Sequence, residues 1–243
     1  MRVLVTGADG FLGRNLVNYL SSSLDIEVLS FTRKQGTQDL QALCGKCQFV
    51  FHLAGVQRPK EKADFVVGNV DLTRLLLGFL EASGSKADIF FSSSIQAASD
   101  NEYGLTKRLA EAELEYYGRR TGRGVFVYRL PHVFGKWGKP NFNSAVNTFC
   151  HNVARGIPIM VNDPSTELTL LYVDDLLAEM NECMRGRRQP GAVHDTLACT
   201  HRVRLGAVVA ALGDFKAGSR PSELMSEFEQ KLYAAFLSYR DPD

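Results

Sequence analysis

Three side chains in the stretch FFSSSIQAASDNEYGLTK, from Phe90 to Lys107, are of the types that together reduce a ketone. Tyr103 and Lys107 are four residues apart, so on a helix they would share one face. A nearby ammonium would lower the pKa of Tyr103 from its usual value of about 10, and the phenol would donate a proton to a forming alkoxide. Ser94 would donate a hydrogen bond to the carbonyl oxygen. By itself, a Tyr and a Lys at this spacing are more often an exposed helix pair, so the surrounding elements must decide.

The first half of the chain alternates apolar runs with segments of helical periodicity. The expected strands cover residues 2–6, 27–32, 48–53, 87–92 and 125–130, and the expected helices cover residues 11–21, 70–83 and 103–121. This alternation predicts an α/β fold of the Rossmann type, a doubly wound parallel sheet with helices on both faces. Ser94 would then follow a strand at its carboxyl end, where such sheets bind ligands.

After Pro131 the alternation loosens, and Pro and Gly become frequent between residues 135 and 164. Short strands are expected at residues 168–173 and 192–197, with helices at residues 143–155, 173–185, 205–212 and 222–239. We expect one domain over residues 1–243, with an NADP-binding core of about residues 1–135. The later segments, about residues 136–243, would largely form a small C-terminal substrate-binding lobe.

A glycine-rich loop joins the first expected strand to the first expected helix. Gly7, Gly10 and Gly13 in TGADGFLG lie at GxxGxxG spacing. Glycines allow a tight turn and a close approach to a pyrophosphate, and the helix N-terminus adds N–H groups and positive dipole. The loop therefore predicts a dinucleotide site, with a glycine-rich turn that binds no ligand as the alternative.

The end of the second strand indicates which dinucleotide. An acidic residue there would bind the ribose hydroxyls of NAD, but this chain has Thr32, Arg33 and Lys34. Two cations without a carboxylate suit the 2′-phosphate of NADP, and Arg14 is a second candidate for that phosphate. The alternative is a solvated basic turn, because Lys and Arg are mostly exposed.

The net charge, the N-terminal sequence and the cysteine count argue against several classes of protein. The formal net charge of +1 gives no electrostatic case for a nucleic-acid or membrane partner. The N-terminus does not resemble a signal peptide, and a cytoplasmic location is expected by default. Five cysteines, an odd count, argue against a disulfide framework, and Cys44 and Cys47 have no second pair or His cluster with which to bind a metal. No metal is therefore expected.

The motifs TGADGFLG, FHLAG, SSS before IQA, and YGLTK resemble, in this order, the extended short-chain dehydrogenases/reductases over nearly the whole chain. The resemblance implies that Ser94, Tyr103 and Lys107 are catalytic and that Lys107 also holds the nicotinamide ribose. It further implies cofactor-binding residues in the glycine loop and after the third strand: Gly7, Gly10, Phe11, Leu12, Gly13, Leu53, Ala54 and Gly55.

Three departures favour a plain reductase within that family. The loop from Ser94 to Tyr103 is shorter than in typical sugar epimerases, and Thr32-Arg33 replaces the acidic residue of NAD-bound epimerases. Ser94 is followed by Ile95 and Gln96 rather than by the Asp-Glu pair of sugar 4,6-dehydratases.

A narrower resemblance links SSSIQAASDNEYGLTK, YRLPHVFGKWGKPNFNSAVNTFCHNVARGIPI and LLYVDDLL to the N-terminal reductase domain of the CapF/WbjC capsular-polysaccharide enzymes. It implies NADPH as cofactor and the C4 ketone of a UDP-4-keto-6-deoxy-N-acetylhexosamine as substrate. The product would be UDP-2-acetamido-2,6-dideoxy-β-L-talose, on the route to UDP-N-acetyl-L-fucosamine. In that family a C-terminal cupin, which would begin about where this chain ends, epimerises the sugar at C3. Coupling to a cupin epimerase domain is therefore expected, as is a homodimer.

Substrate-side residues are less sharply indicated. Pro131 is expected beside the nicotinamide. Five residues are expected to contact the sugar nucleotide: Arg58, Gln96, His132, Asn141 and Asn143. An exposed surface position remains the alternative for Arg58, and simple packing the alternative for His132.

Two other functions remain open. One is another NAD(P)-dependent nucleotide-sugar epimerase or dehydratase. The other is a catalytically inert nucleotide sensor on the same fold, because a fold alone does not establish chemistry. The complete set of Ser94, Tyr103 and Lys107 favours an enzyme, since a sensor has no need of all three.

Overall fold

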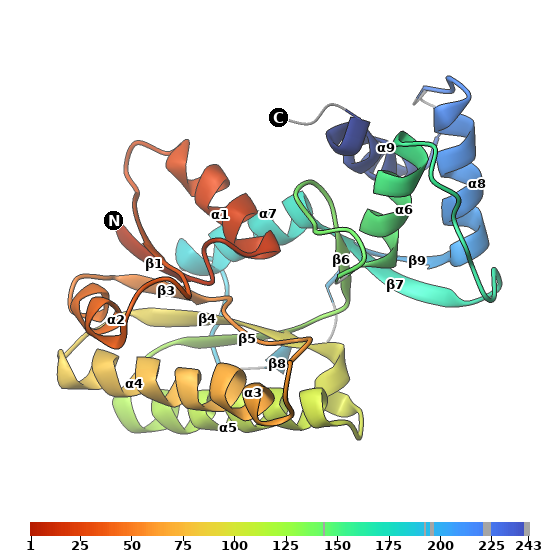
Figure 1. Cartoon of the computed structure of the whole chain (residues 1–243). Helices are drawn as coiled ribbons and strands as arrows, with labels where there is room; N and C mark the ends of the chain where they lie inside the picture. Colours follow the sequence, from red (N-terminus) through yellow and green to blue (C-terminus); the bar gives the residue numbers. More distant parts are fainter. Residues whose placement is uncertain (143, 192, 195–196, 221–224, 241–243) are drawn as a thin grey trace. The chain divides into compact units, whose positions relative to one another are not determined.

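The computed structural model describes residues 1–142, 144–191, 193–194, 197–220 and 225–240 (Figure 1). The chain forms two compact units, each described by itself below. The first unit contains residues 1–130 and 177–196, and the second contains residues 131–176 and 197–243.

The first unit is built on a six-stranded sheet in the order β2-β1-β3-β4-β5-β8, and all its strand pairs are parallel. Its strands are β1 (Arg2–Thr6), β2 (Glu27–Phe31), β3 (Phe49–His52), β4 (Asp88–Ser94), β5 (Val125–Leu130) and β8 (Val193–His194). The chain leaves β1 for β2 on one side and returns to β3 on the other. In doubly wound sheets, nucleotides bind at the carboxyl ends of the strands where the strand order reverses in this way.

Helices cover both faces of this sheet, with α4 and α5 below it and α1 and α7 above it in Figure 1. The helical segments are α1 (Phe11–Ser21), α2 (Thr37–Cys44), α3 (Ala63–Phe65), the π-helix η1 (Val66–Asp71), α4 (Leu72–Ala82), the 3₁₀ turn η2 (Ile95–Ala98), α5 (Glu102–Thr121) and α7 (Val173–Met184), which begins in the second unit. The inner strands β1, β3, β4 and β5 are buried along most of their length, as parallel strands covered on both faces are. Leu4, Val50 and Phe91 accordingly pack with Leu76 and Leu114 in one core cluster.

The second unit has a three-stranded sheet in the order β6-β7-β9, with β7 antiparallel to β9. Its elements are β6 (His132–Phe134), α6 (Ala145–Ala154), β7 (Glu167–Tyr172), β9 (Thr200–Arg204), α8 (Leu205–Lys216) and α9 (Glu227–Arg240). Phe134, Val146, Leu212 and Phe236 belong to its own apolar core. Buried Tyr239 donates to Gly138 O at 2.7 Å and so ties α9 to the loop after β6.

Several elements differ from the sequence expectations. Helix α2 (Thr37–Cys44) was not expected, because its segment combines Gly36 with few apolar residues. The helix expected at residues 70–83 begins earlier, as the π-helix η1 at Val66. Within residues 192–197 the structure describes a strand only at Val193–His194.

The structure also bears on two expectations from composition, which concern membrane-spanning helices and cysteine chemistry. No helix in the described part of the chain combines the length and apolar character that crossing a membrane requires. Cys44, Cys47, Cys150 and Cys183 are buried thiols outside any disulfide, and burial raises the pKa of the Cys44 thiol to about 12. A thiol that stays protonated is a poor nucleophile, so Cys44 and Cys47 pack as small apolar residues at a turn.

Candidate active site

Ser94 and Tyr103 are brought together by a short turn between β4 and α5. Strand β4 ends at Ser94, whose Oγ accepts from the Gln96 backbone N–H at 3.2 Å and starts η2. Asn101 caps α5 by accepting from the Gly104 N–H at 2.7 Å. A Cβ on Gly104 would lie 2.0 Å from Gln96 O, so only glycine allows α5 to approach η2 this closely. Tyr103 hydrogen-bonds with Ser94 as a result.

Lys107 lies one turn further along α5 and is only 3% exposed. Its Nζ donates to Ser92 O at 2.7 Å and lies 4.1 Å from the centroid of the Phe91 ring, so its present contacts are on β4. Burial lowers the pKa of Lys107 to about 7, and the charge of Glu111 opposes that effect.

The pKa of Tyr103 differs from the sequence expectation of a phenol acidified by Lys107. Burial raises the pKa of Tyr103, and the opposing contributions come from hydrogen bonds with Gln57 and Ser94. The reason is that Lys107 directs its ammonium to Ser92 O rather than to the phenol. A raised pKa keeps Tyr103 protonated near neutrality, which is the state that a proton donor needs.

Gln57 is a contact that sequence reasoning missed. Its Nε2 lies 3.5 Å from the Tyr103 hydroxyl oxygen, and it comes from the loop after β3, 46 residues away. Asn69 of the π-helix holds this loop: its Oδ1 accepts from Val56 N at 2.8 Å, and its Nδ2 donates to Val56 O at 3.0 Å. The same Nδ2 donates to Thr106 Oγ1 of α5 at 3.0 Å. π-Helical turns often occur at functional sites, and this one connects the β3 loop to α5.

The glycine loop has the geometry that close backbone packing requires. Gly7 has a φ of +70°, and a Cβ there would lie 2.8 Å from Ala54 N. A Cβ on Gly13 would lie 2.0 Å from Gly7 O, so the third glycine lets α1 pack on the loop. Gly10 is exposed at the N-cap of α1 and has no side chain to cap the helix.

The segment after β3 runs against this loop. Thr6 Oγ1 accepts from Ala54 N at 3.2 Å and hydrogen-bonds His52 Nδ1 at 2.8 Å. Buried His52 also meets Thr73 Oγ1 through its Nε2 at 2.9 Å, and burial lowers its pKa to about 3. His52 is therefore a neutral bridge that fixes the start of Leu53–Gly55 next to Gly7.

The residues at this edge of the sheet fit a dinucleotide. The first turn of α1 contains no acidic residue, and N–H groups at a helix N-terminus suit phosphate oxygens. Thr32 N donates to Gln35 Oε1 at 2.9 Å in the turn after β2, and Arg33 and Lys34 are exposed there. Phe11 and Leu12 open α1 and are half-buried.

The expected substrate-side residues are dispersed. Arg58 and Gln96 are exposed in the first unit, after β3 and within η2. Pro131, His132 and Asn141 belong to the second unit, where exposed Asn141 donates from its backbone N to Thr148 Oγ1 at 2.9 Å with a φ of +57°. Asn143 lies outside the described residues. The roles assigned to these six residues remain predictions.

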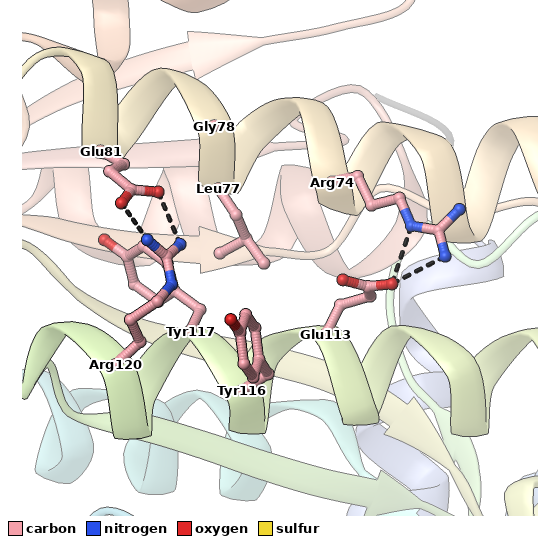
Figure 2. A pocket seen from close by; sticks show the side chains of 8 residues that line it. All are labelled: Arg74, Leu77, Gly78, Glu81, Glu113, Tyr116, Tyr117 and Arg120. Carbon is pink, nitrogen blue, oxygen red and sulfur yellow. Dashed lines mark hydrogen bonds and ion pairs between the residues drawn. The ribbon is translucent and has the colours of Figure 1, made fainter.

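A separate shallow pocket between α4 and α5 is not this site (Figure 2). Its two arginines already pair with carboxylates: Arg74 Nη2 lies 2.7 Å from Glu113 Oε1, and Arg120 Nη2 lies 2.6 Å from Glu81 Oε2. The pocket contains none of the residues expected to bind a cofactor or substrate.

A doubly wound parallel sheet with a glycine loop after β1 and Ser94, Tyr103 and Lys107 gathered after β4 defines the class of extended short-chain dehydrogenases/reductases. The model of the NAD dependent epimerase/dehydratase family matches residues 3–192, and the chain belongs to this family. The expected Rossmann-type fold, nicotinamide cofactor and oxidoreductase class are thereby confirmed at the level of the family.

Individual relatives are consistent with this assignment. The chain is 42% identical over its whole length to a Pseudomonas aeruginosa protein named UDP-2-acetamido-2,6-beta-L-arabino-hexul-4-ose reductase, and spans 66% of that protein. The capsular polysaccharide assembling protein CapF from Staphylococcus aureus has a TM-score of 0.88 at 39% identity, over 98% of this chain and 66% of CapF. UDP-glucuronic acid 4-epimerase from Bacillus cereus has a TM-score of 0.83 at 16% identity over 98% of each chain, a likeness of fold alone.

Proposed function

We propose that this chain reduces the C4 ketone of a UDP-4-keto-6-deoxy-N-acetylhexosamine with NADPH, giving UDP-2-acetamido-2,6-dideoxy-β-L-talose. The observation that carries the proposal is the 42% identity, over the whole chain, to a protein named as a reductase of such a 4-ketose. The product would serve the synthesis of UDP-N-acetyl-L-fucosamine for capsular or O-antigen polysaccharide.

The roles of the residues follow from their positions. A bound nicotinamide supplies the hydride. Ser94 donates its hydroxyl hydrogen to the ketone oxygen and so orients the carbonyl beside Tyr103. Tyr103, kept protonated by burial, donates its proton as the oxygen becomes an alkoxide. Lys107, which uses one of its three N–H donors on Ser92 O, binds the nicotinamide ribose with another, and its charge stabilises the phenolate that remains.

The proposal assigns residues of both units to the binding of cofactor and substrate. The unit that contains β1 to β5 binds NADPH through the glycine loop, Leu53–Gly55 and Thr32-Arg33. The residues assigned to the sugar nucleotide are Arg58 and Gln96 of the first unit and His132, Asn141 and Asn143 of the second. Pro131 lies beside the nicotinamide in this proposal.

A cupin epimerase is the proposed functional partner. The chain spans 66% of the Pseudomonas aeruginosa reductase and 66% of CapF. In the CapF/WbjC resemblance, the remaining part of the protein is the cupin that inverts C3. The substrate of this chain would then be the C3-inverted ketone. A homodimer is proposed on the same resemblance.

The test is a comparison of two ketones that differ only at C3. Purified chain and NADPH are mixed with the C3-inverted UDP-4-keto sugar or with its uninverted precursor, and NADPH consumption is followed by absorbance. We expect rapid consumption with the inverted ketone, and NMR should identify a 6-deoxy-talo product. Equal rates with both ketones would contradict the assigned substrate, and consumption with neither would contradict the reductase function.

A further inference from the structure

A buried carboxylate lies directly behind the proposed catalytic residues. Glu111 follows Lys107 by one turn of α5 and is 7% exposed. Its oxygens accept from Arg129 Nε at 3.0 Å and Arg129 Nη2 at 2.7 Å, and also from the Ser93 hydroxyl. A buried carboxylate is costly unless it is paired and hydrogen-bonded, and Glu111 meets both conditions.

The partners of Glu111 lie at the ends of the two strands that border the site. Ser93 immediately precedes Ser94 in β4 and pairs in register with Arg129 of β5. One side chain of α5 therefore contacts both strands at the level where Ser94 meets Tyr103. Any shift of α5 along β4 would break three charge-assisted hydrogen bonds at once.

The charges around Lys107 give Glu111 a second effect. The titratable groups near this ammonium are His52 of β3, Arg129 of β5, and Tyr103 and Glu111 of its own helix. His52 is neutral, Tyr103 is protonated and Arg129 is a cation. Of these groups Glu111 alone is negative, and its charge raises the pKa of Lys107 against the effect of burial.

We propose that Glu111 is a positioning residue: its contacts with Ser93 and Arg129 fix β4 and β5 against α5, and its carboxylate is the negative charge one helix turn behind the Lys107 ammonium. The inference rests on the proposed function, because it takes Lys107 as the group that acts beside Tyr103. Glu111 itself touches neither substrate nor cofactor in this account.

The decisive experiment measures the titration of Lys107 directly. The chain is labelled with ¹³C at the lysine side chains, the Lys107 ε-carbon is assigned by comparison with Lys107→Arg, and its shift is followed with pH. In Glu111→Gln the pKa of Lys107 should fall by on the order of one unit. Arg129→Gln and Ser93→Ala break the same network but keep the carboxylate, so neither should lower it. An unchanged pKa in Glu111→Gln, or an equal fall in Arg129→Gln, would overturn the proposal.

A second variant covers the case in which Glu111→Gln does not fold. The pair of changes Glu111→Gln and Arg129→Met removes both charges, which disturbs a buried pair less than breaking it does. The pKa of Lys107 should be lower in this variant than in Arg129→Met alone, and equal values in the two would refute the charge effect.

The catalytic consequence is read from pH profiles. Because the ammonium is the active form, kcat/KM should fall as pH rises through the pKa of Lys107, and Glu111→Gln should move this alkaline limb to lower pH. The NMR titration needs neither ketone nor NADPH. A shifted Lys107 in a chain that reduces no ketone would therefore contradict the proposed function and leave the charge effect of Glu111 standing.

Discussion

The Tyr103 hydroxyl hydrogen-bonds with two side chains, Ser94 at the end of β4 and Gln57 in the loop after β3. Burial keeps it protonated while these hydrogen bonds oppose the rise in its pKa. Lys107 donates one of the three N–H groups of its ammonium to Ser92 O. At the scale of single residues, the proposed acid therefore already contacts Ser94, and the proposed cofactor anchor contacts β4.

Cofactor choice yields a prediction at this scale. Replacing exposed Arg33 with alanine should weaken NADPH binding by about 1–3 kcal/mol, the value of a hydrogen bond to a charged group, and leave NADH binding nearly unchanged. Calorimetric titration with both cofactors measures this. Lys46→Ala is the matched control, since it removes an exposed cation from the turn before β3, at the other end of the sheet. Equal losses for NADPH and NADH in Arg33→Ala would refute the 2′-phosphate role.

Sequence spacing could predict only part of this residue-level picture. Ser94, Tyr103 and Lys107 could be predicted from the sequence, because local periodicity alone places them at a strand end and on one helix turn. Gln57 could not be predicted, since its contact with Tyr103 spans 46 residues. The position of Glu111 on the Lys107 face was visible as an i,i+4 relation, but its contacts with Ser93 and Arg129 depend on the register of β4 and β5.

Among the elements, the junction of η2 with α5 determines where Tyr103 lies. Asn101 begins α5 with a side-chain cap, and Arg108 of the same helix donates to Ala97 O at 2.6 Å and Ser99 O at 2.8 Å. Helix α5 is thus bound to the preceding turn both at its first residues and through Arg108, further along the helix. Gly104 completes the junction because no larger residue fits beneath Gln96 O.

Gly104→Ala should therefore damage both stability and catalysis. The new methyl group meets Gln96 O at 2.0 Å, so α5 or η2 must shift, and overpacking of this kind costs about 1–3 kcal/mol. Urea unfolding and turnover measure the two effects, and turnover should fall because the distance from Tyr103 to Ser94 changes. Gly78→Ala in α4 is the control: its methyl group meets no atom within 4 Å, and we expect a gain of about 0.5–1 kcal/mol. A Gly104→Ala variant as stable and active as the parent would contradict this account of the junction.

The prediction of elements succeeded where a local pattern was strong. Helix α5 and strands β1 and β5 were expected within a residue of their observed bounds because each has a clear apolar period and a glycine or cap at its end. The π-helix η1 was not expected. It depends on Asn69 reaching Val56 across 13 residues, and no local pattern encodes that contact.

At the scale of the whole molecule, the alternation of strands and helices was sufficient to predict the parallel sheet of the first unit. The later segments were harder, because residues 177–196 belong to the first unit although they follow part of the second in the chain. Short strands such as β6 and β8 take their conformation from the strands beside them, so their sequences carry little signal.

The central claim is that Tyr103 donates the proton in ketone reduction, and the rate of ketone reduction by Tyr103→Phe tests it most directly. The change removes one hydroxyl whose partners are Gln57 and Ser94, so folding and NADPH affinity should be retained, and both are measured first. Loss of a general acid typically lowers the rate by about 10²–10⁴-fold, and we predict a loss in that range. A folded, NADPH-loaded Tyr103→Phe variant that keeps roughly half of the parent turnover, far above that range, would show that the proton comes from another group and would contradict the account.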